Sequence, residues 1–242
     1  MKNRVTFGLQ SRDYKLTKAI LIYESGEGQS AHSAASVHDI AMQDRCPVIQ
    51  PGHAITVSAV KQLAAALGQS QSIGYLPERL ICIGLEKMVW WCPAGRRRIW
   101  FKPSHAESPG KLEVKPLNGK FVHHPPLLFM VEGGLNVFAL TGNARPRPET
   151  NLYRAPYWNL TDGHMCNGNL KLPEINPEHL ADFEAAFFNS AFTHTSQGTL
   201  TRHPDGHAGM WTELSRRKTP PAAAYWKKNL ITYGKTVAQI LK

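Results

Sequence analysis

The sequence is poor in cysteine and in acidic residues, and it lacks a long hydrophobic run. Its four cysteines are irregularly spaced, which argues against the disulfide framework of a small secreted protein. No apolar stretch approaches the roughly 20 residues that cross a bilayer, and no apolar segment follows the basic N-terminus as in a secretory signal. These absences predict a cytoplasmic protein with reduced cysteines and no membrane association.

The signatures of several enzyme and binding classes are also missing. The sequence has no C-x-x-C pair, no H-E-x-x-H and no deaminase-type zinc motif, and His203 and His207 alone do not make a metal site. A G-x-S-x-G elbow, a phosphate-binding loop and the common nucleic-acid-binding motifs are absent as well. The pair His123–His124 suits the surface. We expect neither a metal nor a cofactor.

Basic residues outnumber acidic ones by 28 to 18, and they are unevenly distributed along the chain. One basic stretch runs through residues 96–120 and a second through residues 216–242. A field of this sign attracts nucleic acid or an acidic protein partner, and it also suits an ordinary basic surface. The charge alone leaves these three interpretations open.

Residues 1–104 are predicted to form a small mixed α+β region. Strand-like patterns at residues 15–23 and 33–42 flank a Gly- and Ser-rich turn, and helical spacing of apolar residues extends from Thr56, a candidate N-cap, to Gly68. Short strands are expected at residues 80–84, 88–91 and 99–101, the last two forming a hairpin around the turn at residues 93–95.

Residues 105–242 are predicted to form a second domain, which makes the fold class α+β. A proline- and lysine-rich stretch separates the two domains, and an N-cap signal (Asn followed by Pro) marks a helix start. The expected elements are a linker or extended crossing at residues 102–125, an apolar hairpin at 127–131 and 135–140, a helix from Asn176 to about Phe188, and an amphipathic segment at 222–241.

The candidate site lies in residues 153–173, YRAPYWNLTDGHMCNGNLKLP, between the apolar hairpin and the helix. Its Asp-Gly pair favours a tight turn, and the glycine and asparagine residues after Cys166 favour an irregular loop. Cys82 and Cys92 lie instead in apolar segments, where cysteine acts as a small hydrophobe. A thiol must be exposed to react. From the residues alone, Cys166 is a candidate nucleophile, a structural cysteine or a metal ligand.

The run from Asn159 to Cys166, N-L-T-D-G-H-M-C, resembles the active-site signature of ubiquitin-conjugating enzymes, in which His-Pro-Asn precedes a turn and a Gly-x-x-Cys. More specifically, the chain resembles the bacterial ubiquitin-conjugating-enzyme-like family D, the family of protein B of the ParB-related, ThiF-related cassette (PRTRC system). Tyr157 and Trp158 stand where the superfamily has His and Pro, and the spacing from Asn159 to Cys166 is one residue shorter. The likeness is carried by VWWCPAGRRRIWF, LLFMVEGGLNVFAL, RPRPETNLYRAPYWNLTDGHMCNGN and FFNSAFTH.

The resemblance implies a ubiquitin-conjugating-enzyme-like antiparallel sheet with flanking helices in residues 105–242. It further implies that the protein accepts a ubiquitin-like modifier from a ThiF-like activating enzyme as a thioester on Cys166 and passes it to an amine. Two alternatives remain open. One is a catalytically inactive member of the fold that acts as a scaffold, and the other is a basic nucleic-acid-associated protein of a plasmid or mobile cassette.

The resemblance also assigns roles around the candidate catalytic residue, Cys166. Asn159 is the candidate donor to the oxyanion that forms when an amine attacks the thioester, and a turn-stabilising amide is the alternative role. His164 is a candidate for assisting proton transfer or an exposed loop residue. Tyr157 and Trp158 are expected to pack the loop, with exclusion of water from the thioester as a further role.

Overall fold

A computed structural model describes most of the chain, in two compact units that comprise residues 1–74 and 75–242. The second unit begins at Tyr75, earlier than the boundary between residues 104 and 105 expected from the sequence. The reason is that the strands between Leu80 and Cys92 belong to the main sheet of this unit. The described residues are 16–25, 32–44, 46–56, 59–60, 63–64, 75–84, 86–103, 111–166, 168, 170–194 and 198–241.

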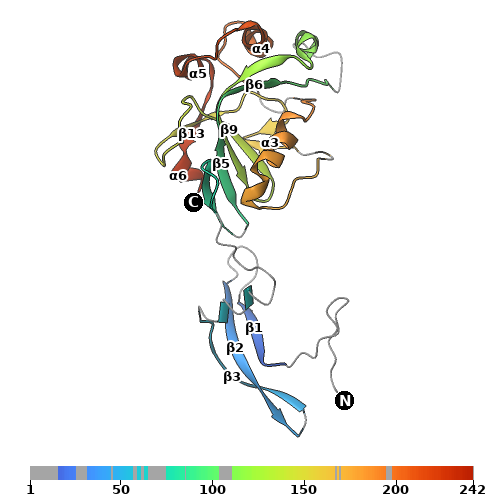
Figure 1. The fold of residues 1–242 in the computed structure, drawn as a ribbon, viewed down its shortest axis with the longest axis vertical. Coiled ribbons are helices and arrows are strands. Elements are labelled where there is room, and N and C mark those ends of the chain that lie inside the picture. Colours follow the sequence, from blue (N-terminus) through green and yellow to red (C-terminus); the bar gives the residue numbers. More distant parts are fainter. Residues whose placement is uncertain are drawn as a thin grey trace. The chain divides into compact units, whose positions relative to one another are not determined.

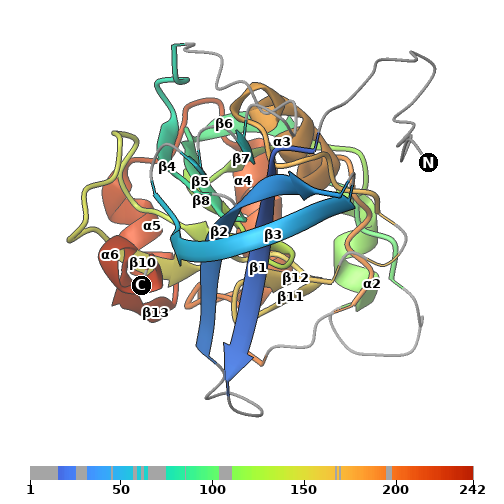
Figure 2. The same ribbon diagram turned by 90° about the horizontal axis from the view of Figure 1, so that it is seen from below.

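The first unit contains a three-stranded antiparallel sheet in the order β1-β2-β3 (Figure 2). The pairing of β1 with β2 confirms the two strands predicted on either side of the Gly- and Ser-rich turn. After Thr56 the chain is helical at residues 59–60 and 63–64, and Thr56 Oγ1 accepts the Ala59 N–H at 3.2 Å as an N-cap. The other positions of this predicted helix lie outside the described residues. The strands are β1 (Lys18–Ser25), β2 (His32–Gln43) and β3 (Cys46–Ala54).

The second unit is built around an eight-stranded sheet (Figure 1). Six of its strands follow the order β11-β12-β9-β8-β5-β4, while β10 pairs with both β9 and β13. The antiparallel pair β8–β9 confirms the apolar hairpin predicted from the sequence. The strands are β4 (Leu80–Ile83), β5 (Met88–Cys92), β8 (Leu127–Val131), β9 (Leu135–Ala139), β10 (Asn151–Arg154), β11 (Leu160–Thr161), β12 (His164–Met165) and β13 (Thr232–Thr236).

Two further strands, β6 (Gly95–Arg98) and β7 (Phe121–His124), form a separate antiparallel ribbon. The predicted hairpin between residues 88–91 and 99–101 is therefore wrong. Both edges of β5 are already occupied, by β4 and by β8, so no edge is free for the segment that follows. Pro93 comes directly after β5 and has no N–H to continue the ladder, which turns the chain out of the sheet.

The helices of the described residues all lie in the second unit, apart from the positions after Thr56. Asn176 starts the segment that leads into α3, because its side chain accepts the Glu178 N–H at 2.9 Å, and this confirms the predicted helix start. The predicted linker at residues 102–125 is wrong over its described part, which holds α2, η2 and β7. No helix among the described residues is long and apolar enough to cross a membrane. The helices are α2 (Lys111–Val114), η2 (Lys115–Leu117), η3 (Pro177–His179), α3 (Leu180–Phe188), α4 (Gly206–Arg216), α5 (Ala223–Asn229) and α6 (Val237–Ile240).

The main sheet buries both of its faces, since successive side chains of a strand point to opposite sides. On one face Trp90 stacks on Phe129, with ring centroids 5.2 Å apart, and also packs against Phe183 of α3. The intervening strand residues, such as Leu128, join a second cluster that includes Val237 of α6. Figure 1 shows α3 and α6 on these two sides of the sheet. Burial on both faces explains why β5 and β8 are apolar throughout.

Candidate functional site

The segment that carries Cys166 is a hairpin of two very short strands, β11 and β12. The residues that join them, Asp162 and Gly163, have φ angles of 48° and 89°. Two successive positive φ angles define a two-residue type I′ turn, for which Asp-Gly is a favoured pair. The tight turn predicted from the sequence is confirmed.

The register of this hairpin places Asn159 opposite Cys166. Leu160 pairs with Met165, and both side chains are buried in the main core. One position further from the turn, the Cys166 N–H donates to the Asn159 carbonyl at 2.8 Å. The spacing between these two residues, although shorter than in the superfamily signature, is therefore the spacing that brings them face to face across a two-residue turn.

Gly163 is required by this turn for two independent reasons. Its φ of 89° lies in the region that side chains with a Cβ rarely adopt. A Cβ at Gly163 would also collide with the ring of Phe138 on β9. The close approach allows the Gly163 carbonyl to accept the Val137 N–H at 2.8 Å, and this hydrogen bond fixes the hairpin to β9.

We predict that Gly163→Ala destabilises the second unit by about 2–4 kcal/mol, since strain at positive φ adds to the collision with Phe138. Gly133→Ala is the matched control, because Gly133 also has a positive φ of 61° but has no atom within 4 Å of the added Cβ. Chemical denaturation should give a clearly smaller loss for Gly133→Ala. Equal losses for the two variants would show that contact with Phe138 does not matter.

The side chain of Asn159 binds the loop that follows α3. Asn159 is buried, with a φ of 62° that asparagine tolerates better than most residues. Its Oδ1 accepts the Thr193 N–H at 3.0 Å, the Thr193 hydroxyl at 3.1 Å and the His194 N–H at 3.2 Å. Its Nδ2 donates to the Ala191 carbonyl at 2.9 Å. The side chain of Asn159 therefore holds the backbone of residues 191–194 in place, while the backbone carbonyl of Asn159 accepts the Cys166 N–H.

Tyr157 and Trp158, which stand where the superfamily has His and Pro, are core residues. Tyr157 is fully buried, and its hydroxyl lies 2.8 Å from Nδ1 of His124. Its ring packs edge-on against Phe187 of α3, with centroids 5.0 Å apart. Trp158 stacks on His207 of α4, with centroids 5.9 Å apart. Both residues fix the base of the hairpin to the helices, and neither offers a polar group at the surface.

Two histidines, the buried His124 and the partly buried His207, support this aromatic packing in their neutral form. His124 Nε2 donates to the Arg97 carbonyl at 3.2 Å, so Nδ1 is free to accept the Tyr157 hydroxyl. Burial, followed by the charge of Arg97, lowers the pKa of His124 to about 3, and burial lowers the pKa of His207 to about 4. The expectation that His123–His124 lies at the surface is wrong, because both side chains are buried.

We predict that the protein loses stability steadily as pH falls below about 6.5. The folded pKa values of His124 and His207 lie below the usual value of 6.5, so folding favours the neutral rings. Their contribution is complete above pH 6.5, and each loses about 1.4 kcal/mol per pH unit as pH falls toward 4. Denaturant titrations between pH 7 and pH 4.5 measure this slope, and His207→Gln should reduce it. A constant stability down to pH 5 would contradict the assignment.

The thiol of Cys166 is exposed, whereas Cys92 is buried and Cys82 is partly buried. Burial raises the pKa of Cys92 to about 12, which makes that thiol unreactive. His164 is exposed, and its ring lies over the β8–β9 turn, so that a Cβ at Gly134 would come within 2.6 Å of it. Among the contacts of the described residues, no hydrogen bond joins His164 to Cys166.

A comparison with protein families identifies the group to which this hairpin and sheet belong. Residues 56–232 match the model of Prokaryotic E2 family D, which covers more than half of the chain. The chain belongs to this family. The match includes the main sheet except for most of β13, the hairpin of Cys166 and the loop that binds Asn159, and membership suggests an E2-like carrier. Comparisons with curated proteins and with solved structures found no match.

In this family D chain, an open groove lies between residues 170–174 and α3, shortly after Cys166. Its volume is about 610 Å³. Leu170, Leu172 and Ala186 contribute apolar lining, while charged and polar groups surround them. Lys171, Glu174, His179, Asp182, Asn189 and Ser190 are the polar lining residues. The groove has room for a short extended peptide, and its lining begins at Leu170, shortly after Cys166 in the sequence.

The loop after α3 was not predicted from the sequence to be part of the site. Thr193 and His194, which bind Asn159, lie at the end of FFNSAFTH, one of the segments that carry the family resemblance, and that likeness was the available signal.

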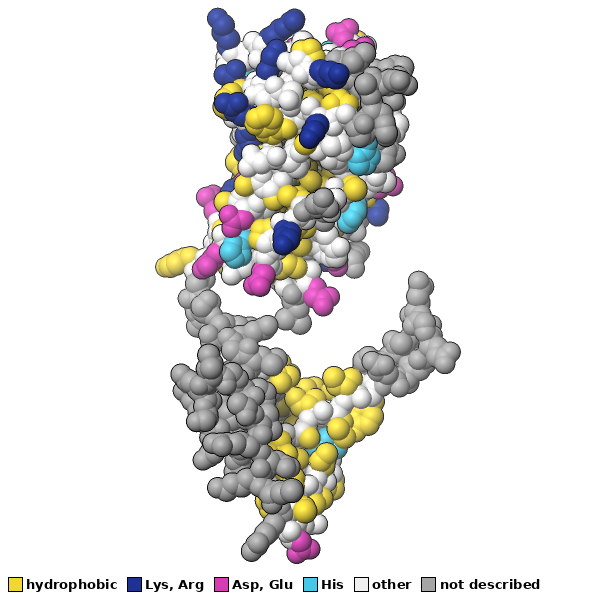
Figure 3. Space-filling view, turned by 90° about the vertical axis from the view of Figure 1, so that its right-hand side faces the viewer, with side chains coloured by type: hydrophobic (Ala, Val, Ile, Leu, Met, Phe, Trp, Pro, Cys, Tyr) yellow, Lys and Arg dark blue, Asp and Glu magenta, His cyan; other side chains and the backbone are white. Residues whose placement is uncertain are grey.

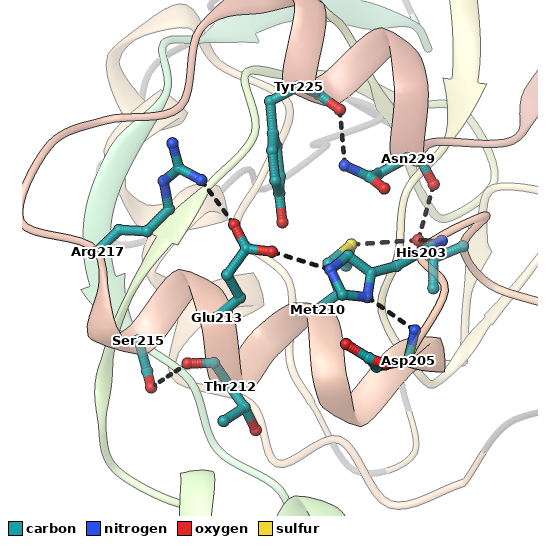
Figure 4. Close-up of polar contacts among 10 residues, drawn as sticks. His203, Asp205, Met210, Thr212, Glu213, Ser215, Arg217, Tyr225 and Asn229 are labelled. Atoms are coloured by element: carbon teal, nitrogen blue, oxygen red, sulfur yellow. Dashed lines mark hydrogen bonds and ion pairs between the residues drawn. The ribbon is translucent and has the colours of Figure 1, made fainter.

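Helix α4 was not predicted from the sequence either. His203 and His207 have the spacing of metal ligands, yet His203 Nε2 donates to Glu213 at 2.9 Å (Figure 4). Among the described residues, no group of three or more ligand-type side chains is placed to hold a metal.

Proposed function

We propose that this family D protein accepts a ubiquitin-like modifier as a thioester on Cys166 and transfers it to an amine. The observation that carries the proposal is the exposed Cys166 thiol, held opposite Asn159 by a tight hairpin at the Gly-x-x-Cys position of the E2-type signature. Family membership supports an activating enzyme and a ubiquitin-like protein as partners in general terms. A ThiF-like enzyme is the expected donor of the activated modifier.

The proposed chemistry exchanges one thioester for another and then consumes it. The Cys166 thiolate attacks the carbonyl carbon of the modifier's C-terminal thioester, so a bond from Sγ to carbon forms and the thiolate of the activating enzyme leaves. An amine then attacks the same carbon, the Sγ–carbon bond breaks and the amine gives up a proton as the amide forms. Cys166 is restored as a thiol. No oxidant, metal or cofactor enters the balance.

Asn159 acts in this proposal as a positioning residue. Its carbonyl accepts the Cys166 N–H, and its side chain is occupied by the Ala191 carbonyl and by donors from Thr193 and His194. An oxyanion role would use the second N–H of the same amide, since an amide nitrogen carries two hydrogens. The contacts account for a positioning role without that step, and variants of Asn159 separate the two.

The groove beside α3 is the proposed place for the C-terminal tail of the modifier. A thioester on Cys166 must be preceded by an extended peptide, and residues 170–174 line a groove of about 610 Å³ shortly after the thiol. Small side chains, Ala185 and Ala186, keep part of the groove open. Ala185→Trp fills this space, while Ala181→Trp places the same ring at an exposed position of α3 outside the lining. Slower loading is expected for the first variant alone.

Reconstitution tests the proposed function. The purified protein is incubated with ATP, a ThiF-like activating enzyme and its modifier, and the products are separated on gels with and without a thiol reductant. We expect an ATP-dependent band larger by one modifier that disappears on reduction. A band that resists reduction in the wild-type protein, or no band while the activating enzyme itself is loaded, would contradict a thioester carrier.

The scaffold alternative makes a different demand on the site. A catalytically inactive member of the fold has no need of an accessible thiol, and a buried Cys166 would favour that alternative. Cys166 is exposed.

We also propose that the chain is the protein B component of a ParB-related, ThiF-related cassette, which predicts that the ThiF-related protein encoded beside it is the activating enzyme that loads Cys166.

A further inference from the structure

The two basic stretches of the sequence, far apart in the chain, meet at one end of the second unit. In the β6–β7 ribbon Arg96 pairs with His123, and His123 Nε2 lies 3.2 Å from the carbonyl of Arg217, at the end of α4. This contact places residues 216–218 beside the ribbon. Figure 3 shows Lys and Arg side chains gathered toward the upper end of this unit, whereas most of its acidic side chains in view lie toward the lower end.

The two faces of the ribbon have different characters. Arg97 pairs with Val122, which is completely buried, so this pair faces the core. On the opposite face Arg96, Arg98 and Phe121 are exposed, whereas His123 is buried against the carbonyl of Arg217. Phe121 is 47% exposed, and the Arg98 guanidinium lies 4.8 Å from the centre of its ring. The ribbon therefore presents an aromatic ring beside arginines to the solvent.

The positive charges of this surface are not neutralised within the described part of the chain. Glu213 lies on α4, as Arg216 does, but its carboxylate already binds Arg217 at 2.6 Å and His203 at 2.9 Å (Figure 4). We name the exposed residues Arg96, Arg98, Lys120, Arg216 and Lys218 the basic face. None of the ion pairs between described residues involves one of these side chains.

We propose that the basic face, together with Phe121, binds single-stranded nucleic acid. Guanidinium groups bind phosphate oxygens in a forked geometry, which suits the three arginines of the face. An exposed aromatic ring beside cations offers a stacking platform for an unpaired base. An acidic protein would use the charges but gain little from the face of Phe121, and the bases of a duplex are already stacked. This activity goes beyond the carrier function and shares no residue with the hairpin of Cys166.

Fluorescence anisotropy with labelled oligothymidine, oligouridine and a DNA duplex of equal length tests the proposal across a range of salt concentrations. Wild-type protein should bind one or both single strands more tightly than the duplex. Phe121→Ala should weaken single-strand binding at least about fivefold with an unchanged salt slope, and Phe121→Trp should restore it. The double variant Arg96→Gln with Arg98→Gln should lower the slope of log affinity against log salt concentration by about 1.4, because each lost phosphate contact contributes about 0.7.

Two control variants distinguish binding at the basic face from non-specific electrostatic attraction to a positively charged protein. Lys171→Gln with Lys235→Gln removes the same charge from exposed positions outside the basic face and should leave affinity within about twofold. Cys166→Ala should bind like wild type, which separates this result from the fate of the carrier proposal. The proposal is overturned if the wild-type protein does not bind at low salt, if the lysine control loses as much as the arginine variant, or if Phe121→Ala binds like wild type. The last outcome would point to an acidic protein partner.

Discussion

Replacing Cys166 by alanine is expected to abolish the thiol-labile adduct with the modifier completely. A thioester needs the sulfur, and alanine offers no nucleophile at this position. Because Cys166 is exposed, the variant should keep the melting temperature of the wild-type protein. Cys46→Ala is the matched control, since Cys46 is also an exposed cysteine but belongs to the first unit. That control should load as fully as the wild type on a non-reducing gel.

The corresponding serine variant distinguishes a nucleophile from a residue that only supports loading. Cys166→Ser should load slowly and hold the modifier as an oxygen ester, which survives thiol reductants and is cleaved by hydroxide. Loading of Cys166→Ala at the wild-type level would remove this residue from the mechanism. Loss of the adduct in Cys46→Ala with retention in Cys166→Ala would move the site to the other unit.

Asn159→Ala is expected to destabilise the second unit and to impair loading at the same time. The substitution removes an acceptor from the backbone N–H groups of Thr193 and His194 and a donor from the Ala191 carbonyl. Loss of these partly buried hydrogen bonds costs about 2 kcal/mol. For a protein of this size the melting temperature should fall by about 4–8 °C, measured by differential scanning calorimetry.

Asn159→Asp separates positioning from oxyanion stabilisation. A carboxylate still accepts the bonds from Thr193 and His194 and tolerates the left-handed backbone, but it has no N–H to donate. If Asn159 positions the hairpin, loading and discharge should follow stability, with the aspartate variant between wild type and alanine. A variant that loads at the normal rate and melts near the wild-type temperature, yet discharges to an amine about 100-fold more slowly, would assign the oxyanion role instead.

Local chemistry was predictable where it was dictated by neighbouring residues. The Asp162–Gly163 turn, the β8–β9 hairpin and the Asn176 cap each depend on side chains within a few positions of one another. The exposure of Cys166 follows from the same kind of signal, because the polar loop residues around it cannot form a buried strand. Its position opposite Asn159 is also a local consequence, since it needs only the length of the turn.

Long-range pairing was not predictable in the same way. The aromatic segment after Trp91 looked like one hairpin, but β5 pairs with β8 and β6 pairs with β7, choices that depend on strands far along the chain. The partners of Asn159 lie more than thirty residues away, at Thr193 and His194. Helix α4 was likewise not predicted, because residues 203–207 at its start are polar and its buried side chains pack against elements far along the chain.

The most direct test of the account is the intact mass of the wild-type protein after loading, followed by mapping of the modified peptide. If Cys166 carries the modifier, the mass should increase by one modifier less one water, on the peptide that contains Cys166, and a thiol reagent should remove the increase. An unchanged mass in the presence of a loaded activating enzyme would contradict it. So would the same increase on Cys46, on Cys82 or on a lysine.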